Sequence, residues 1–334
     1  MNGNIKGVSV IICCFNSADK IEKTLSYLAS QIKQEGIQYE IILVDNNCTD
    51  ATVQKALACW EFLGKPFPLY VTVQSVSGLT YARQKGIAAA NYEYLILCDD
   101  DNWLSDNYLQ KVYAIFETIP NVALAGGVGE AVFENEKFTP PEWFQKIQGF
   151  GYAVGDEGRK TGYTCAVYGA GMCIRKSVFE KLIGDKLSFI LSDRNGKFLS
   201  SGGDTEICII IEKAGYKIFF DTSLRFKHFI TADRLQWGYY LQLRRSFGIA
   251  TAYLQAYSSN SVVNTPSTVR FAKQAIQYWF LITRHIHFFL FPFFFKTASC
   301  ASFVQQLSLK KTMLLKKNKI ETLAEKINQL FNHL

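Results

Sequence analysis

With 334 residues, 49% of them apolar and 19% charged, the chain can build a large hydrophobic core, which excludes a disordered or fibrous protein and allows one large α/β domain with an extension. The formal net charge is +7, but ten Lys or Arg against two Glu follow residue 269, so the preceding body is nearly neutral. A general nucleic-acid-binding protein carries its positive charge along a working face, so this distribution argues against that class.

The first hundred residues alternate between strand-like and helix-like segments. Continuous apolar runs predict four strands, at residues 8–14, 39–44, 69–73 and 94–98. Strands that are apolar throughout are buried on both faces, so the βαβαβαβ order predicts a mostly parallel sheet flanked by helices. Ligands bind such sheets beyond the carboxyl ends of the strands. Polar residues follow the four predicted strands at these ends: Asn16, Asp45 to Asn47, Gly78 and Asp99 to Asp101.

The second half of the chain is less regular. Residues 133–164 are rich in Gly, Pro and Tyr, and we expect a long loop over the sheet edge there. After residue 230 the pattern is helical, so we place one domain at residues 1–230 and a helical, aromatic-rich extension at 231–334. Between these regions the sequence predicts strands at 168–174 and 216–221 and helices at 176–182 and 204–214.

Three consecutive aspartates, Asp99, Asp100 and Asp101, follow the fourth predicted strand. Adjacent carboxylates repel one another and are costly at the edge of a core unless a cation neutralises them. On an extended chain Asp99 and Asp101 point to the same side, so the pair can bind one Mg²⁺ or Mn²⁺ and leave positions for phosphate oxygens. The alternative is a helix cap, in which Asp100 to Asn102 precede a helix that follows Leu104.

This arrangement resembles family 2 glycosyltransferases of the GT-A fold, a Rossmann-like α/β architecture. The resemblance covers residues 8–230. It implies a metal-dependent, inverting enzyme that transfers a sugar from a nucleotide-sugar donor, commonly a UDP-sugar, to the hydroxyl of a saccharide or lipid-linked acceptor in the synthesis of cell-surface polysaccharide or glycolipid. Six motifs carry it in order, at residues 8–16, 44–50, 78–86, 97–104, 169–175 and 202–206.

The resemblance assigns donor-binding roles to individual positions. It implies that Asp45 accepts a hydrogen bond from the base of the donor, although an Asx turn after the strand is the alternative. It implies that Gly78 lets the backbone approach the donor and that Arg83 faces phosphate or supports the aspartates. For Arg83 a surface salt bridge is the alternative. The donor-binding set is therefore Phe15, Asn16, Asp45, Asn47, Gly78, Arg83, Asp99 and Asp100.

Two further roles follow from the chemistry of sugar transfer. The departing diphosphate develops negative charge that a divalent cation offsets, and the resemblance implies that Asp99, Asp101 and His228 bind this cation. The attacking hydroxyl loses its proton to a carboxylate, which the resemblance assigns to Asp204. Many relatives carry a Glu-Asp pair there, whereas this chain has glycine before Asp204, so Glu206 is the second candidate. The alternatives are an ordinary helix N-cap for Asp204 and a structural role for His228.

The C-terminal extension is strongly aromatic at residues 278–295. Arg284, His285 and His287 interrupt this segment, and its uninterrupted part is shorter than the ~20 residues that a membrane span needs. We expect an in-plane contact with a membrane surface. The alternative is a helical subdomain or a homodimer face. Four lysines would reinforce the membrane contact: Lys310, Lys311, Lys316 and Lys317.

The cellular location follows from the cysteines and the N-terminus. Nine scattered cysteines without a CxxC pair indicate reduced core thiols in a cytosolic protein, and they make a zinc site improbable. The N-terminal residues show no charged segment followed by an apolar one, so we expect no secretory signal peptide. Together with the basic extension, this places the protein in the cytoplasm, on the cytoplasmic face of a membrane.

Three other functional classes are considered. A sugar nucleotidyltransferase is disfavoured because no glycine-rich, lysine-containing phosphate loop occurs near the N-terminus. A non-catalytic carbohydrate- or nucleotide-binding protein would have lost some of its carboxylates, yet Asp45, Asp99, Asp101 and Asp204 are all present. A dehydrogenase is disfavoured as well, because no GxGxxG follows the first strand.

Overall fold

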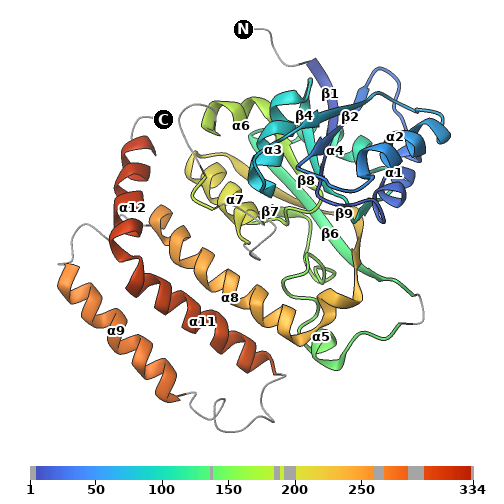
Figure 1. The fold of residues 1–334 in the computed structure, drawn as a ribbon. Coiled ribbons are helices and arrows are strands. Elements are labelled where there is room, and N and C mark those ends of the chain that lie inside the picture. Colours follow the sequence, from blue (N-terminus) through green and yellow to red (C-terminus); the bar gives the residue numbers. More distant parts are fainter. Residues whose placement is uncertain are drawn as a thin grey trace.

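The computed structural model describes residues 5–135, 138–183, 189–191, 201–258, 267–284 and 297–331. In this part of the chain nine strands form one sheet that is flanked by helices, and a group of helices extends away from it (Figure 1). The predicted α/β class is therefore confirmed.

The first four strands form the parallel part of the sheet. They are β1 (Ile5–Cys14), β2 (Gln38–Asp45), β3 (Leu69–Val73) and β4 (Tyr92–Asp99). Their order is β3-β2-β1-β4, and all three neighbouring pairs are parallel, as the sequence predicts.

Beyond β4 the sheet is mixed. Strand β8 is antiparallel to both β4 and β6, whereas β9 is parallel to β6 and antiparallel to β5 and β7. The predicted strand at 168–174 lies further along the chain, and the one at 216–221 is the first half of a longer strand. Strands β5, β6 and β7 are not expected from the sequence pattern. The remaining strands are β5 (Asn102–Leu104), β6 (Val122–Phe133), β7 (Gly162–Thr164), β8 (Met172–Arg175) and β9 (Lys217–Ile230).

The apolar strands face two cores, one on each side of the sheet. In β1, Ile11 belongs to one cluster of buried residues, whereas Val10 and Ile12 belong to the other. In β2, Ile42 and Leu43 divide in the same way. Successive side chains of a strand point to opposite faces, so a strand covered on both faces is apolar throughout.

Helices connect the strands and form the extension. In the extension, α8 (Trp237–Leu254) and α11 (Ala298–Leu315) cross closely, because a Cβ atom at Gly248 would lie only 2.1 Å from the carbonyl oxygen of Gln305. The helices are α1 (Ile21–Ala29), α2 (Thr52–Phe62), α3 (Leu79–Ala89), α4 (Tyr108–Thr118), α5 (Glu142–Lys146), α6 (Lys176–Ile183), α7 (Gly203–Lys213), α8 (Trp237–Leu254), α9 (Ser267–Arg284), α11 (Ala298–Leu315) and α12 (Lys317–Phe331), with the 3₁₀ helices η1 (Ala232–Leu235) and η2 (Gln255–Ser258).

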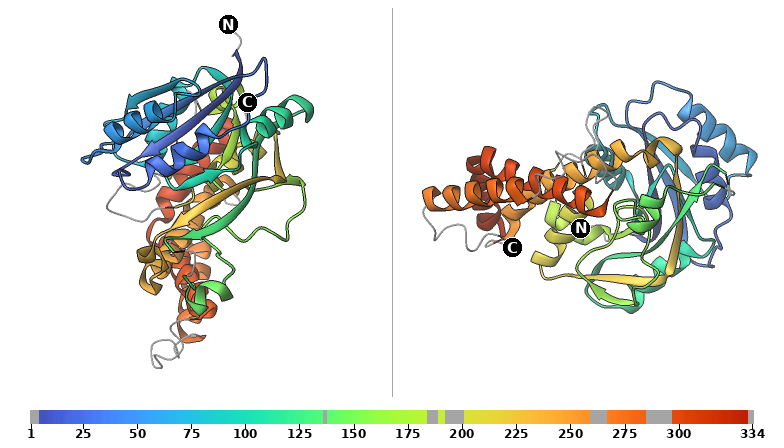
Figure 2. Two further views of the ribbon diagram at one scale, coloured as in Figure 1. Left: turned by 90° about the vertical axis from the view of Figure 1, so that its right-hand side faces the viewer. Right: turned by 90° about the horizontal axis from the view of Figure 1, so that it is seen from below.

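The extension projects to one side of the sheet and then returns to it (Figure 2). Helix α9 packs on α11 through Leu281 and Phe303. Helix α12 contributes Ala324 and Ile327 to the same core cluster as residues of α7. Among the described helices, none is both long enough and apolar enough to cross a bilayer. The phenylalanine-rich run at 288–295 lies outside the described residues.

Candidate active site

The candidate site lies at the carboxyl edge of the parallel strands. Here Cys14 of β1 is paired with Asp45 of β2, and Cys13 is paired with Asp99 of β4. Strand β1 lies between β2 and β4. Because adjacent strands lie about 4.8 Å apart, the backbones of Asp45 and Asp99 are about 10 Å apart. The structure thus places the polar ends of β1, β2 and β4 side by side.

Two asparagines shape the loops after β1 and β2. Asn16 and Asn47 have φ angles of 52° and 64°, a left-handed conformation that asparagine adopts more readily than most residues. The Oδ1 atom of Asn16 accepts a hydrogen bond from the backbone N–H of Thr49 at 2.8 Å, and the Nδ2 atom of Asn47 donates to the carbonyl of Ser75 at 2.8 Å. Each of these side-chain amides thus links its own loop to a neighbouring loop. The side chain of Phe15, next to Asn16, is 50% exposed at the rim of the site.

The polar groups that follow β2 bind the protein's own backbone. The Oδ1 atom of Asp45 accepts a hydrogen bond from Cys48 N at 2.8 Å, which is a local turn of the kind considered as the alternative for this residue. The buried side chain of Asn46 donates to two carbonyls of the loop between β3 and α3 and accepts from Gly78 N at 2.9 Å. The N–H of Gly78 is therefore used inside the protein, and glycine is favoured there by its φ angle of 143°. The approach of this backbone to a donor stays a prediction.

The three consecutive aspartates face three different parts of the protein. Asp99 ends β4, whereas Asp100 and Asp101 form a turn before β5. The predicted extended geometry, in which Asp99 and Asp101 share one side, is therefore wrong. The helix-cap alternative is wrong as well, because the turn leads into a strand and α4 begins only at Tyr108.

Asp100 is turned toward the beginning of α1. Its carboxylate accepts a hydrogen bond from the hydroxyl of Ser17 and lies 3.3 Å from the Nζ atom of Lys20. Burial and the neighbouring Asp101 raise the pKa of Asp100 to about 6, while Lys20 and Ser17 oppose this shift. These contacts favour a structural role for Asp100, which was predicted to bind the donor.

Arg83 pairs with Asp99 and lies next to Gly169, which Asp204 also contacts. Its Nη2 atom lies 3.5 Å from the Oδ1 atom of Asp99, and the side chain is buried, so the surface salt bridge considered for Arg83 is wrong. Gly169 separates the guanidinium from Asp204, because a Cβ atom there would lie 2.9 Å from Arg83 Nη2 and 3.2 Å from Asp204 Cβ. The Oδ2 atom of Asp204 accepts from Gly169 N at 3.2 Å, and its Oδ1 atom accepts from Thr205 N at 2.8 Å. The end of β4 and the beginning of α7 therefore converge here.

The two acidic residues of the first turn of α7 have different surroundings. The N-cap of α7 is Gly202, so Asp204 is not the capping residue of the alternative interpretation, and its side chain is partly exposed. Glu206 is fully buried and accepts from two backbone N–H groups of residues 189–191, at 2.6 and 3.0 Å, and from the hydroxyl of Tyr257 at 2.6 Å. Burial and the adjacent carboxylate raise the pKa of Tyr257, so its hydroxyl keeps the proton that it donates. Glu206 thus joins α7 to the extension.

On the other side of the turn, Asp101 meets β9 and η1. The Nη1 atom of Arg234 donates to Asp101 Oδ2 at 3.0 Å and to His228 Nε2 at 3.1 Å. His228 Nε2 lies 3.6 Å from Asp101 Oδ1. The Nδ1 atom of His228 lies 2.6 Å from the carbonyl of Tyr152, which can only accept, so in the neutral ring Nδ1 carries the proton and Nε2 is the acceptor. The hydroxyl of Tyr152 donates to the carbonyl of Arg234 at 2.7 Å.

These atoms suit a divalent cation. Burial by itself raises the pKa of Asp101, but the surrounding positive charge, which includes Arg234 at 3.0 Å, outweighs burial and holds that pKa well below its usual range, so the carboxylate is ionised. A carboxylate oxygen and an unprotonated imidazole nitrogen are ordinary ligands of Mn²⁺ and related ions. Within the described ranges no three or more His, Cys, Asp or Glu side chains converge as a complete metal centre. A cation at Asp101 and His228 would therefore take its other ligands from phosphate and water.

Sequence reasoning does not identify Tyr152 as part of this site. The contact with His228 comes from its backbone carbonyl, which every residue possesses. The available signal is the local density of glycines, since Gly149, Gly151 and Gly155 all have positive φ angles and fold the segment tightly around Tyr152. This segment lies within the region predicted only as a loop.

Comparison with known proteins gives consistent matches. The family model described as "Glycosyl transferase family 2" matches residues 9–183. Cholesterol galactosyltransferase of Borreliella burgdorferi is 31% identical over 106 residues, which are 32% of this chain and 28% of that protein. Poly-beta-1,6-N-acetyl-D-glucosamine synthase of Staphylococcus epidermidis is 26% identical over 123 residues, 37% of this chain and 28% of that protein. The chain therefore matches little more than a quarter of the length of these relatives.

Solved structures share the fold at low sequence identity. The mannosyltransferase PcManGT from Pyrobaculum calidifontis, in complex with GDP-Man and Mn²⁺, has a TM-score of 0.56 and 14% identity over 94% of this chain and 88% of that chain. GalNAc-T7 with UDP, GalNAc and Mn²⁺ has a TM-score of 0.51 and 18% identity over 76% of this chain and 51% of that chain. The fold is that of GT-A glycosyltransferases.

Proposed function

The chain belongs to glycosyl transferase family 2, and from this premise we propose that it transfers a sugar from a nucleoside-diphosphate sugar to an acceptor hydroxyl, with inversion at the anomeric carbon. The observation that carries this proposal is the convergence of the Asp99–Arg83 ion pair and Asp204 at Gly169, near the edge where the parallel strands end. This convergence supports a catalytic domain at residues 1–230 that extends from a base pocket to an acceptor site.

The donor's base is assigned to the rim formed by the loops after β1 and β2. Phe15 is half exposed there and offers an aromatic face to a base. Asp45 uses Oδ1 for its turn, and its other oxygen is assigned to the imide N–H of uracil, which makes a UDP-sugar the preferred donor. Asn16 and Asn47 hold these loops in place through their bonds to Thr49 and Ser75.

The diphosphate is assigned to the aspartate turn. Asp101 and His228 are proposed to hold Mn²⁺ or Mg²⁺ through Oδ and Nε2 atoms, and a bound cation would offset the charge of the departing diphosphate, which contributes several kcal/mol to catalysis. Asp99 was predicted as a further cation ligand. Because Asp99 pairs with Arg83, we assign it to orienting that guanidinium, which can face phosphate or sugar oxygens.

Asp204 is the proposed general base. Two backbone N–H groups orient its carboxylate, and its side chain is partly exposed, so an acceptor hydroxyl can reach it. Proton transfer to such a group contributes about 10²- to 10⁴-fold to the rate. Attack from this side, opposite the departing diphosphate, inverts the anomeric centre. The buried bonds of Glu206 favour Asp204 over Glu206 for this role.

A donor screen tests the proposed function. UDP-, GDP- and dTDP-sugars are added with Mn²⁺ to the wild type, to Asp101→Ala and to Glu61→Ala, a control at an exposed carboxylate of α2. Thermal stabilisation and nucleotide release are measured. We expect one class of donor to stabilise the wild type and the control but not Asp101→Ala. If all three proteins respond alike to every donor, the transferase proposal fails and a non-catalytic binding role replaces it.

We also propose that the extension contacts an anionic membrane surface, which would bring the site to a lipid-linked acceptor or a growing saccharide. One side of α9 carries Ile276, Trp279 and Phe280, which are 64 to 69% exposed. The opposite side packs on α11 through Leu281. Tryptophan and phenylalanine at such positions suit the interface between headgroups and acyl chains.

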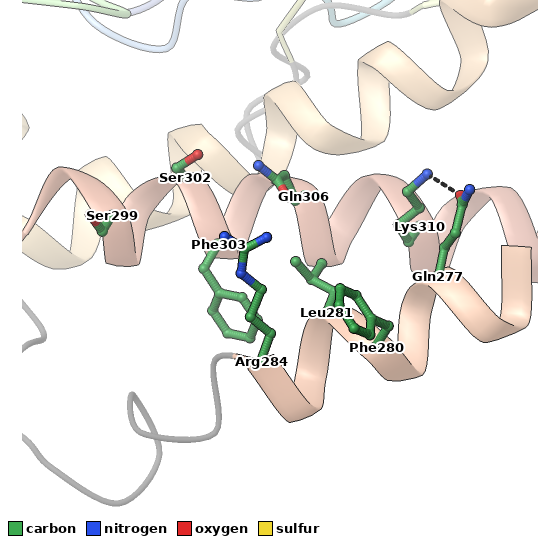
Figure 3. Close-up of a pocket in the computed structure, with 9 residues that line it drawn as sticks. All are labelled: Gln277, Phe280, Leu281, Arg284, Ser299, Ser302, Phe303, Gln306 and Lys310. Atoms are coloured by element: carbon green, nitrogen blue, oxygen red, sulfur yellow. Dashed lines mark hydrogen bonds between the residues drawn. The ribbon is translucent and has the colours of Figure 1, made fainter.

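Basic groups border this face. A groove of about 420 Å³ lies between α9 and α11, and Figure 3 shows Arg284 at one end of its apolar floor and Lys310, bonded to Gln277, at the other. Each cation near an anionic surface contributes about 1 kcal/mol to membrane binding. The groove is lined by Gln277, Phe280, Leu281, Arg284, Ser299, Ser302, Phe303, Gln306 and Lys310.

Vesicle sedimentation tests the membrane contact. The wild type is mixed with phosphatidylcholine vesicles with and without phosphatidylglycerol, beside a Trp279→Ala, Phe280→Ala double variant. Tyr163→Ala removes an equally exposed aromatic side chain from the sheet and is the control. We expect only the double variant to lose binding to anionic vesicles. Equal binding of all three proteins contradicts the proposal, and loss of a dimer in the double variant, measured by light scattering, would assign the face to self-association.

A further inference from the structure

Arg234 lies where a cation would bind in the proposed site. Its Nη1 atom is 3.0 Å from Asp101 Oδ2 and 3.1 Å from His228 Nε2, so one guanidinium nitrogen contacts both proposed cation ligands. Bonds from such ligand atoms to a divalent metal are about 2.0–2.2 Å long, so an ion bound by both would occupy the space that the nitrogen now fills. The guanidinium and the metal ion therefore exclude each other.

The hydrogen bonding of this region is incomplete around Arg234. The buried Nε atom of Arg234 has no hydrogen-bond partner in the described part of the chain, and neither has Nε1 of Trp237 at the beginning of α8. An unsatisfied buried donor destabilises the conformation that contains it. Arg234 lies in η1, and Trp237 begins α8 two residues after η1 ends, so both donors without a partner belong to the segment that follows β9.

The backbone of Arg234 is held by contacts that do not involve its side chain. The hydroxyl of Tyr152 donates to the carbonyl of Arg234 at 2.7 Å, and the next residue, Leu235, is buried in the core cluster beside α8. The Arg234 side chain itself is 14% exposed. A rotation of this side chain toward solvent would release Asp101 and His228 without unfolding η1.

We propose that Arg234 is an internal cation, which occupies the metal position of the donor-free enzyme and must be displaced before a divalent cation binds. This inference rests on the proposed roles of Asp101 and His228. The guanidinium keeps the two ligands in place and neutralises Asp101 until the donor arrives. The donor's diphosphate supplies further ligands to the cation and an anionic partner to the displaced guanidinium, so metal and donor bind cooperatively.

Mn²⁺ binding to the donor-free protein tests this inference. The free ion is quantified by electron paramagnetic resonance for the wild type, Arg234→Gln and Arg234→Lys. Arg234→Gln removes the charged hydrogen bond to Asp101 that competes with the metal. Such a bond contributes enough free energy that its loss should tighten Mn²⁺ binding at least about tenfold. Arg234→Lys keeps a competing cation and should bind Mn²⁺ nearly as weakly as the wild type. Saturating UDP should reduce the difference between wild type and Arg234→Gln.

Arg245→Gln is the matched control, because it removes the same charge from an exposed position of α8. We expect its Mn²⁺ affinity to stay within about twofold of wild type, as for a screened surface charge. If Arg234→Gln binds Mn²⁺ no more tightly than this control, the inference is overturned and Arg234 only supports Asp101.

Thermal unfolding gives a second readout that does not depend on activity. Without metal, Arg234→Gln should have a lower Tm than the wild type, because Asp101 loses its buried partner. Mn²⁺ should then raise the Tm of the variant more than that of the wild type, and a variant that Mn²⁺ does not restore contradicts the inference. Adding Asp101→Asn to Arg234→Gln should remove the gain. Failure of the wild type to bind Mn²⁺ even with UDP present would instead overturn the proposed metal role of Asp101.

Discussion

Asp99 and Asp101 are two residues apart in the chain, but they belong to different halves of the site. Asp99 forms an ion pair with Arg83 at 3.5 Å, and its side chain is 30% exposed, so this half is open to solvent. Asp101 lies in a buried set of contacts with His228 and Arg234 at 3.0 to 3.6 Å. The open half suits a group that reacts with substrate, whereas the closed half suits a position that a positive charge must always occupy.

The largest expected effect comes from Asp101→Asn in the closed half. Removing this charge leaves the proposed cation with one protein ligand, so kcat/KM should fall by about 10³-fold or more, and added Mn²⁺ should not restore it. Steady-state kinetics with the donor identified by the screen measure this, and circular dichroism checks the fold. Activity within tenfold of wild type would show that Asp101 holds no catalytic cation.

Asp204→Asn in the open half should lower kcat by about 10²- to 10³-fold, because a general base is lost. The donor KM and the Mn²⁺ affinity should stay within about twofold of wild type, since the substitution leaves the diphosphate site intact. This separation of kcat from KM distinguishes the two halves. A raised donor KM with unchanged kcat would instead place Asp204 among the donor-binding residues.

Glu206→Gln should affect stability rather than chemistry. The Glu206 carboxylate accepts three hydrogen bonds in a buried position, and the amide of Gln would turn an N–H₂ group toward one of those donors. We expect the free energy of unfolding, measured by urea denaturation, to fall by about 2–3 kcal/mol. Tyr257→Phe removes one of the three bonds and should cost about 1.5 kcal/mol. A hundredfold loss of kcat at unchanged stability would make Glu206 the base.

The parallel half of the sheet could be predicted because each of its features depends on neighbouring residues. Strands β1, β2 and β4 are apolar throughout, as burial on both faces requires, and their carboxyl ends locate the polar loops. Helical geometry also separates Asp204 from Glu206, because residues two positions apart on a helix point about 200° apart. Because the two side chains point in different directions, the predicted helix already implied that only one of them faces the site.

The resemblance grouped Asp101 with His228, and the structure places them 3.6 Å apart. The geometry of this closed half could not be derived from local patterns, because it depends on long-range pairing. Strand β5 pairs with β9 so that Asn102 lies opposite His228, and this pairing forces the aspartates into a turn. An extended-chain rule fails wherever a distant strand reverses the chain. Arg234 and the carbonyl of Tyr152 reach the same point from two further segments, and no local pattern encodes that convergence.

The smallest expected effect tests whether the open half depends on the spacing between Arg83 and Asp204, which lie on either side of Gly169. Gly169→Ala places a Cβ atom 2.9 Å from Arg83 Nη2 and 3.2 Å from Asp204 Cβ, while the φ angle of this residue lies outside the left-handed region. Because the end of a flexible arginine can yield, we expect about a tenfold loss of kcat/KM, about 1.4 kcal/mol in the barrier, with little change in Tm. Gly158→Ala is the control, since a Cβ atom there meets nothing within 4 Å. If both variants retain wild-type kinetics, the spacing between Arg83 and Asp204 does not govern catalysis, and Asp204 acts without the support of Asp99.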